Sequence, residues 1–134
     1  MIDIENEVYT AVRNAVLADF HSASVSGAYE PSPSAFPHLT VECTNNSVYE
    51  RLESSLEMEN AVSMQFDLNG YSNKQNGKKT ECKALMDSAD AVMKSFGFRR
   101  LSLRIVPNLA DASIYRMTAT YTAVVSKDNI IYRR

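Results

Sequence analysis

A strict two-residue alternation runs through residues 61–69, Ala61-Val62-Ser63-Met64-Gln65-Phe66-Asp67-Leu68-Asn69. The large apolar side chains fall at positions 62, 64, 66 and 68, and the polar ones fall between them. Successive side chains of a β-strand point to opposite faces, so this pattern predicts a strand with one buried face. It is the clearest strand signal in the first half of the chain, and we expect the sheet to form around it.

Similar alternation predicts strands at residues 38–43, 101–105 and 115–125, and a short last strand at 130–132 after a turn at 126–129. In the long stretch 115–125, Arg116 and the threonines at 118, 120 and 122 share one face. Such a face offers flat hydrogen-bonding area for contacts between subunits, although threonine also simply favours strands.

Helical spacing of apolar residues predicts two helices. The first has Asp3 as its N-cap and ends near residues 19–22, and the second extends from about Lys79 to Phe96. Gly97 is well placed to end the second helix, since glycine accepts the left-handed conformation. The segment 31–37 holds three prolines and is expected to be a rigid surface crossing.

These elements follow one another in the order α-β-β-α-β-β-β. Consecutive strands with short connections pair antiparallel, and helices must bury their apolar stripes against the sheet. We therefore expect an α+β fold, with two helices packed on a mainly antiparallel sheet of about five strands. The 134 residues and 15.0 kDa correspond to a single domain over residues 1–134.

Composition limits the functional classes. No run of about eighteen apolar residues exists, so we expect no membrane-spanning segment. The acidic start lacks the features of a secretory signal, which favours an intracellular protein. Cys43 and Cys82 stand 39 positions apart without a Cys-x-x-Cys spacing, and we expect two ordinary buried thiols and no zinc site.

No catalytic, cofactor-binding or metal-binding residue is indicated by spacing. His21 and His38 have no acid–base partner at a useful spacing, and the glycines at 70 and 77 do not form a phosphate-binding turn. We expect a protein that is not an enzyme and has no cofactor. A small hydrolase with Cys43 or Cys82 as its nucleophile is the enzymatic alternative.

The charges divide along the chain. Residues 1–67 carry 11 acidic and 2 basic side chains, whereas residues 68–134 carry 5 acidic and 12 basic ones. Such a division lets one part of a molecule attract the opposite part of another copy, as readily as it attracts nucleic acid. Neutralisation within one molecule is the alternative, and no basic recognition helix or aromatic interleaving favours sequence-specific nucleic-acid binding.

Several stretches resemble one family. These are Phe36-Pro37-His38-Leu39-Thr40-Val41-Glu42, residues 70–79 with Gly70-Tyr71-Ser72-Asn73-Lys74 and Gly77-Lys78-Lys79, Pro107-Asn108-Leu109-Ala110-Asp111-Ala112-Ser113-Ile114-Tyr115-Arg116, and the ending 121–134. Together they resemble the tail terminator, or tail completion, proteins of long-tailed bacteriophages. The resemblance spans most of the chain. Its motifs are structural, so they do not separate this family from related small neck or head–tail joining proteins.

The resemblance implies a structural virion protein that forms a homo-hexameric ring on the tail tube, ends tube polymerisation and docks the head. The implied partners are other copies of the chain, the tail tube protein and a head-completion or connector protein, with DNA passing through the lumen. The implied location is the virion tail, assembled in the host cytoplasm. The alternatives are a head–tail joining or minor capsid protein, and a monomeric cytoplasmic binding module that uses residues 31–37.

The interface residues are predicted from charge, since no family motif fixes them. For the ring contact we expect basic residues to meet acidic residues of a neighbouring subunit: Arg99, Arg100, Arg104, Arg116 and Arg133 against Glu50, Glu53, Glu57 and Glu59. For contact with the tube or connector we expect the segment 49–60, through Tyr49, Arg51, Leu52, Leu56 and Met58.

Overall fold

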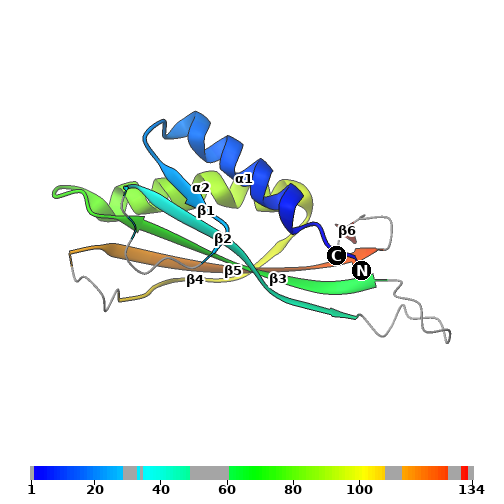
Figure 1. The fold of residues 1–134 in the computed structure, drawn as a ribbon. Helices are drawn as coiled ribbons and strands as arrows, with labels where there is room; N and C mark the ends of the chain where they lie inside the picture. The colour runs from blue at the N-terminus through cyan, green and yellow to red at the C-terminus, as the bar shows by residue number, and fades with distance from the viewer. Residues whose placement is uncertain are drawn as a thin grey trace.

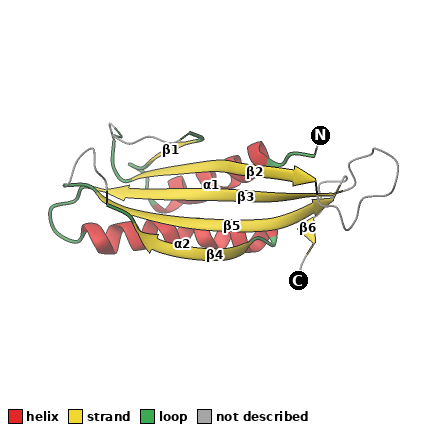
Figure 2. Cartoon of the chain, turned by 90° about the horizontal axis from the view of Figure 1, so that it is seen from below, coloured by secondary structure: helices red, strands yellow, loops and turns green. Residues whose placement is uncertain are grey.

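Two helices lie on one face of a mostly antiparallel sheet in the computed structural model, which describes residues 2–28, 33, 35–48, 61–107, 113–126 and 131–132 (Figures 1 and 2). This confirms the α+β class and the two-layer arrangement. In chain order the elements are α1 (Glu5–Asp19), β1 (Ser24–Ser26), β2 (His38–Val48), β3 (Ala61–Ser72), α2 (Lys78–Phe96), β4 (Arg99–Ile105), β5 (Tyr115–Ser126) and β6 (Ile131–Tyr132).

Strand β3 lies at the centre of the sheet, whose order is β1-β2-β3-β5-β4, with β6 also paired to β5. It pairs with β5 along its whole length, from Ala61 opposite Ser126 to Ser72 opposite Tyr115. The four large apolar side chains of the opening alternation are fully buried, as predicted: Val62, Met64, Phe66 and Leu68.

The predicted element order is incomplete at one place. Residues 24–26, expected to be a loop, form the short strand β1, which pairs parallel to residues 38–40 of β2. The described sheet therefore has six strands where about five were expected, in the order α-β-β-β-α-β-β-β. Three residues with a single apolar side chain carry no periodic signal, so only the pairing reveals this strand.

Strand β2 also extends beyond its predicted end at Cys43. The register with β3 shifts between Cys43 and Asn45, and pairing then continues to Val48. A β-bulge of this kind accommodates one extra residue in a strand and restores the ladder beyond it. Asn45, Asn46 and Ser47, which are polar and carry no strand signal, are exposed residues of this strand.

Both helices begin and end close to their predicted positions. At the start of α1, the N-cap residue is Ile4 and not the predicted Asp3, although the Asp3 carboxylate accepts a hydrogen bond from the Glu5 backbone N–H at 2.9 Å. At the end of α2, Gly97 has φ of 98°, and the Phe98 N–H donates to the Met93 carbonyl at 3.0 Å. The left-handed glycine termination predicted for α2 is thus confirmed.

Only one of the two thiols is deeply buried. Cys82 has no exposed surface, its Sγ donates to the Gly70 carbonyl at 3.2 Å, and burial raises its pKa to about 12. Cys43 is half-buried, and burial followed by the charge of Glu5 raises its pKa as well. A raised pKa keeps a thiol protonated at neutral pH, which argues against either one as a nucleophile.

Gly70 of β3 lies directly against Met86 of α2, and it provides a test of this packing. A Cβ built there would lie 2.7 Å from Met86 Sδ and 3.2 Å from Met86 Cγ. We expect Gly70→Ala to lower the free energy of unfolding by about 1 kcal/mol or more, because the buried methionine must be displaced. Urea denaturation measures the change. Gly70→Ala combined with Met86→Ala should lose less stability than the two single changes added together, and strict additivity would contradict the contact.

Candidate functional site

The strand β4 forms one lateral edge of the sheet and is almost entirely exposed (Figure 2). Three large apolar side chains lie on it at unusual exposure: Leu101 at 48%, Leu103 at 38% and Ile105 at 57%. The strand that alternation predicted at residues 101–105 is present. Its apolar side chains, however, are exposed and are not part of the core. An exposed apolar edge strand is a surface on which another strand can add.

Three of the predicted interface arginines lie on this same strand. Arg99 and Arg104 are exposed, and their guanidinium groups form no hydrogen bond or ion pair with a described residue. Arg100 NH1 lies 3.5 Å from Asp90 Oδ1 of α2, which also forms a 3.0 Å ion pair with Lys94. The edge strand therefore combines three positive charges with three exposed apolar side chains.

Arg116 has an internal role in the sheet. Its Nε and NH2 groups donate to Asn69 Oδ1 at 3.1 and 2.8 Å, and its guanidinium lies 5.8 Å from the centroid of the Tyr71 ring. Such an anchored guanidinium mainly stabilises the face of the sheet opposite the helices. The structure thus places this predicted interface residue away from the exposed edge.

The remaining predicted interface residues lie outside the described residues. They are Arg133 and the residues of the segment 49–60, namely Tyr49, Glu50, Arg51, Leu52, Glu53, Leu56, Glu57, Met58 and Glu59.

The threonine face of β5 is partly occupied by bonds within the sheet. Thr118 Oγ1 donates to Asn69 Oδ1 at 2.7 Å, and Thr120 Oγ1 donates to Asp67 Oδ1 at 2.9 Å. These hydroxyls satisfy polar groups of β3 across the strand pair. The face therefore offers less hydrogen-bonding area to a partner than its sequence suggested.

A serine–histidine contact that the sequence did not reveal joins β1 to β2. Ser24 Oγ lies at hydrogen-bonding distance from His38 Nδ1, and the two residues are opposite each other in the parallel register. Only 5% of His38 is exposed, and its ring stacks at a tilt with Tyr71, 5.8 Å away. A buried ring of this kind holds the short strand in place and leaves little access for a substrate.

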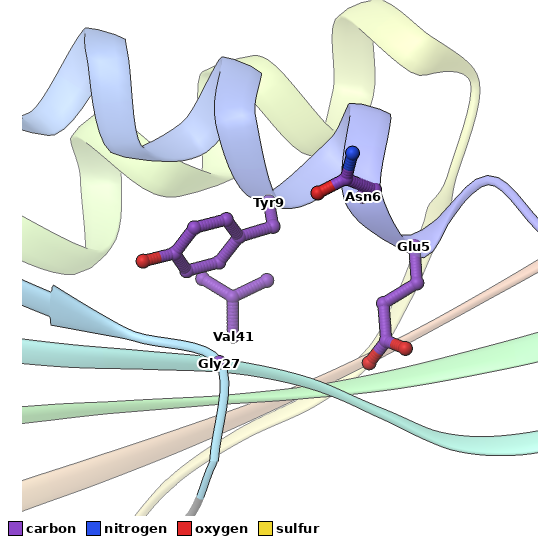
Figure 3. Close-up of a pocket in the computed structure, with 5 residues that line it drawn as sticks. All are labelled: Glu5, Asn6, Tyr9, Gly27 and Val41. Carbon is purple, nitrogen blue, oxygen red and sulfur yellow. The ribbon is translucent and has the colours of Figure 1, made fainter.

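A shallow pocket of about 270 Å³ lies between α1 and the sheet, lined by Glu5, Asn6, Tyr9, Gly27 and Val41 (Figure 3). Two of its polar groups make hydrogen bonds within the protein. The Glu5 carboxylate accepts from the Cys43 N–H at 2.9 Å, and the Tyr9 hydroxyl donates to the Val25 carbonyl at 3.1 Å. These two hydrogen bonds attach α1 to β2 and to β1. The residues that line the pocket include no nucleophile.

Within the described ranges, no group of three or more His, Cys, Asp or Glu side chains is arranged to hold a metal ion. The two described helices are too short or too polar to cross a membrane.

No protein-family model matches the chain, and no curated protein matches it either. The exposed β4 edge is therefore the best-supported candidate site in the described part of the chain.

Proposed function

We propose that this protein is a tail terminator of a long-tailed bacteriophage. In this role it forms a ring on the end of the tail tube, ends tube polymerisation and provides the docking surface for the head. The observation that carries the proposal is the β4 edge, where three arginines and three exposed apolar residues form a surface without catalytic features. The resemblance in sequence supplies the biological setting.

Ring formation suits this surface physically. A subunit whose basic edge contacts a different, acidic part of its neighbour makes a head-to-tail contact, which closes into a ring when the rotation fits. Segment 49–60 follows β2 directly in the chain. It carries four glutamates and one arginine, so it can supply the acidic part of the contact. Opposed charges of this kind favour correct pairing and fast association.

The proposed partners are further copies of the chain in a hexameric ring, the tail tube protein, and a head-completion or connector protein. Assembly takes place in the host cytoplasm, and the product resides in the virion tail. DNA passes through the lumen of the ring without sequence reading, in line with the absence of a basic recognition helix among the described elements. No step of this function requires an enzymatic reaction.

Particles assembled without this chain provide the test. We expect tubes of variable, excessive length that fail to join filled heads, because nothing stops polymerisation or offers the docking surface. Electron microscopy of the lysate measures both the tube length and the fraction of joined particles. Tails of normal length that fail to join heads would instead identify a head–tail joining protein. Tails of normal, fixed length joined to heads would contradict the proposal.

A further inference from the structure

The sheet has two open edges, and together they hold all the exposed large apolar side chains of the described residues. Leu101, Leu103 and Ile105 lie on β4, and Val48, 45% exposed, lies at the end of β2. Strand β1 covers only residues 38–40 of β2. From Thr44 to Val48, the outer side of β2 pairs with no described strand, and we refer to this stretch as the β2 edge. The Cys43 N–H before it is already bonded to the Glu5 carboxylate.

We infer that the β4 edge of one subunit pairs antiparallel with the β2 edge of the next, so that the sheet continues from subunit to subunit. The inference rests on the proposed ring and specifies its contact. It commits to a second copy of this chain as the occupant of both edges. Strand direction, side-chain faces and charge support this contact.

Strand direction is compatible with this contact. Each neighbouring pair along β2-β3-β5-β4 is antiparallel, so β2 and β4 of one subunit point in opposite directions. A neighbouring subunit related by a rotation axis inclined to the strands, as in a closed barrel, keeps its strand directions approximately and is shifted along them. Its β2 edge therefore arrives antiparallel to β4, as required for hydrogen bonding in the same sense as within the subunit.

The side chains on the two edges match in face. Leu103 lies opposite Ala119, and Val48 lies opposite Val62, and both of these partners belong to the helix-covered face. A continued sheet keeps its faces, so the exposed apolar side chains of both edges lie on this same side. Ser102 is level with Asp67 of β3 and Ser47 is level with Ser63, so these parts of the two edges come opposite each other when the neighbour is shifted by about four residues along the strands. On the other side, Ser102 and Arg104 of β4 meet Asn45 and Ser47 of β2, which are polar.

Charge favours the β2 edge over a second β4 edge as the partner. Two β4 edges would bring together two sets of Arg99, Arg100 and Arg104, and like charges across an interface cost free energy. The described residues from Thr44 to Val48 carry no charge, and Val48 leads directly into the segment 49–60 with its four glutamates. A contact between different edges is also the kind that generates a ring.

Site-directed cross-linking tests the contact. In a Cys43→Ser background, Ser102→Cys and Ser47→Cys place one thiol on each edge, and a bis-maleimide of roughly 5–8 Å covers direct and diagonal cross-strand neighbours. Within one subunit these positions are three strand spacings apart, roughly 14 Å, and are out of reach. The double variant is expected to give a ladder beyond the dimer on a denaturing gel, and an equimolar mixture of the two single variants should stop at the dimer.

Two controls define the contact. Ser63→Cys, on the central strand β3, should give no cross-link with Ser102→Cys, because a strand in the middle of a sheet has no access to a neighbouring subunit. Dimers formed by Ser102→Cys alone would show a β4-to-β4 contact and overturn the inference. The absence of a ladder from the double variant would also overturn it, while the length and joining of tails made without the chain would still decide the proposed function.

Charge reversal gives a second, independent readout. Arg99→Glu combined with Arg104→Glu should weaken self-association by about tenfold or more, measured by light scattering. Raised salt should also weaken the self-association of the unmodified protein, because it screens the opposed charges. The matched control, Lys79→Glu with Lys83→Glu, makes the same charge change at exposed positions of α2 and should leave association unchanged. Equal losses in the two variants would show a net-charge effect and contradict pairing at β4.

Discussion

Replacing Phe66 with alanine is expected to lower the free energy of unfolding by about 3–5 kcal/mol, the largest loss of any single change proposed for this chain. Phe66 lies in the middle of the central strand and has no exposed surface. Its ring meets the Phe98 ring edge to face, with centroids 5.2 Å apart and planes at 89°. Alanine removes this contact and leaves a cavity between sheet and helices, which the rigid strand pairs cannot close. Urea denaturation followed by circular dichroism measures the loss.

Two neighbouring changes show whether the loss comes from packing. Phe66→Leu keeps most of the volume and should cost less than about 1.5 kcal/mol. Gln65→Ala alters the next residue, which lies on the face without helices, and should stay within about 0.5 kcal/mol. If Phe66→Ala cost no more than Gln65→Ala, the buried position of the ring would be wrong.

Replacing Tyr121 with phenylalanine is expected to cost about 1.5–3 kcal/mol, because it removes a buried hydrogen bond to a charged group. The Tyr121 hydroxyl donates to Asp90 Oδ1 at 2.6 Å and connects the sheet to α2. Burial, followed by the hydrogen bond and charge of Asp90, raises the pKa of Tyr121, so the phenol stays protonated as a donor. The same denaturation experiment measures the effect, and Tyr9→Phe, at a half-buried hydroxyl bonded to a neutral carbonyl, is the matched control.

Acid should weaken the same link. Burial acts to raise the pKa of Asp90, but the hydrogen bonds from Tyr121 and Lys94 and the charges of Lys94 and Arg100 outweigh it, and the pKa falls below the usual 3.8. A lowered folded-state pKa stabilises the fold above the unfolded-state pKa, and this stability is lost as the pH falls through the folded-state value. We expect the unfolding free energy of Asp90→Asn to depend less on pH below about 4 than that of the unmodified protein. Parallel acid titrations of the two proteins would contradict the role of Asp90.

The sequence predicted the parts of the fold that are periodic and buried. The alternation around Phe66 and in residues 115–125, and the glycine at 97, correspond to features that depend on local geometry. Strand β1 was missed because only its pairing with β2, and no pattern in its own three residues, defines it as a strand. The end of β2 was missed because its exposed polar residues resemble those of a turn. Alternation in β4 also could not distinguish an edge strand from a covered one, since both have the same period.

The candidate site was predictable only as a set of charges. Arg99 and Arg104 lie exposed on one strand, as a surface contact requires. Arg100 and Arg116 have partners within the fold, and the Asn69 partner of Arg116 is 47 positions away in the chain. A sequence pattern shows that a guanidinium is present, but the approach of distant strands decides whether its bonding capacity is already used.

The long pairing of β3 with β5 determines how this subunit would come apart. Each of these strands contributes 12 residues to one uninterrupted antiparallel ladder, whereas β1 and β6 contribute 3 and 2 residues at the periphery. Opening in proteins proceeds through cooperative units, from weakly held margins toward the best-paired centre. Backbone amides of the central pair should therefore exchange with solvent last, and mechanical or thermal stress would peel the outer strands away while that pair still held.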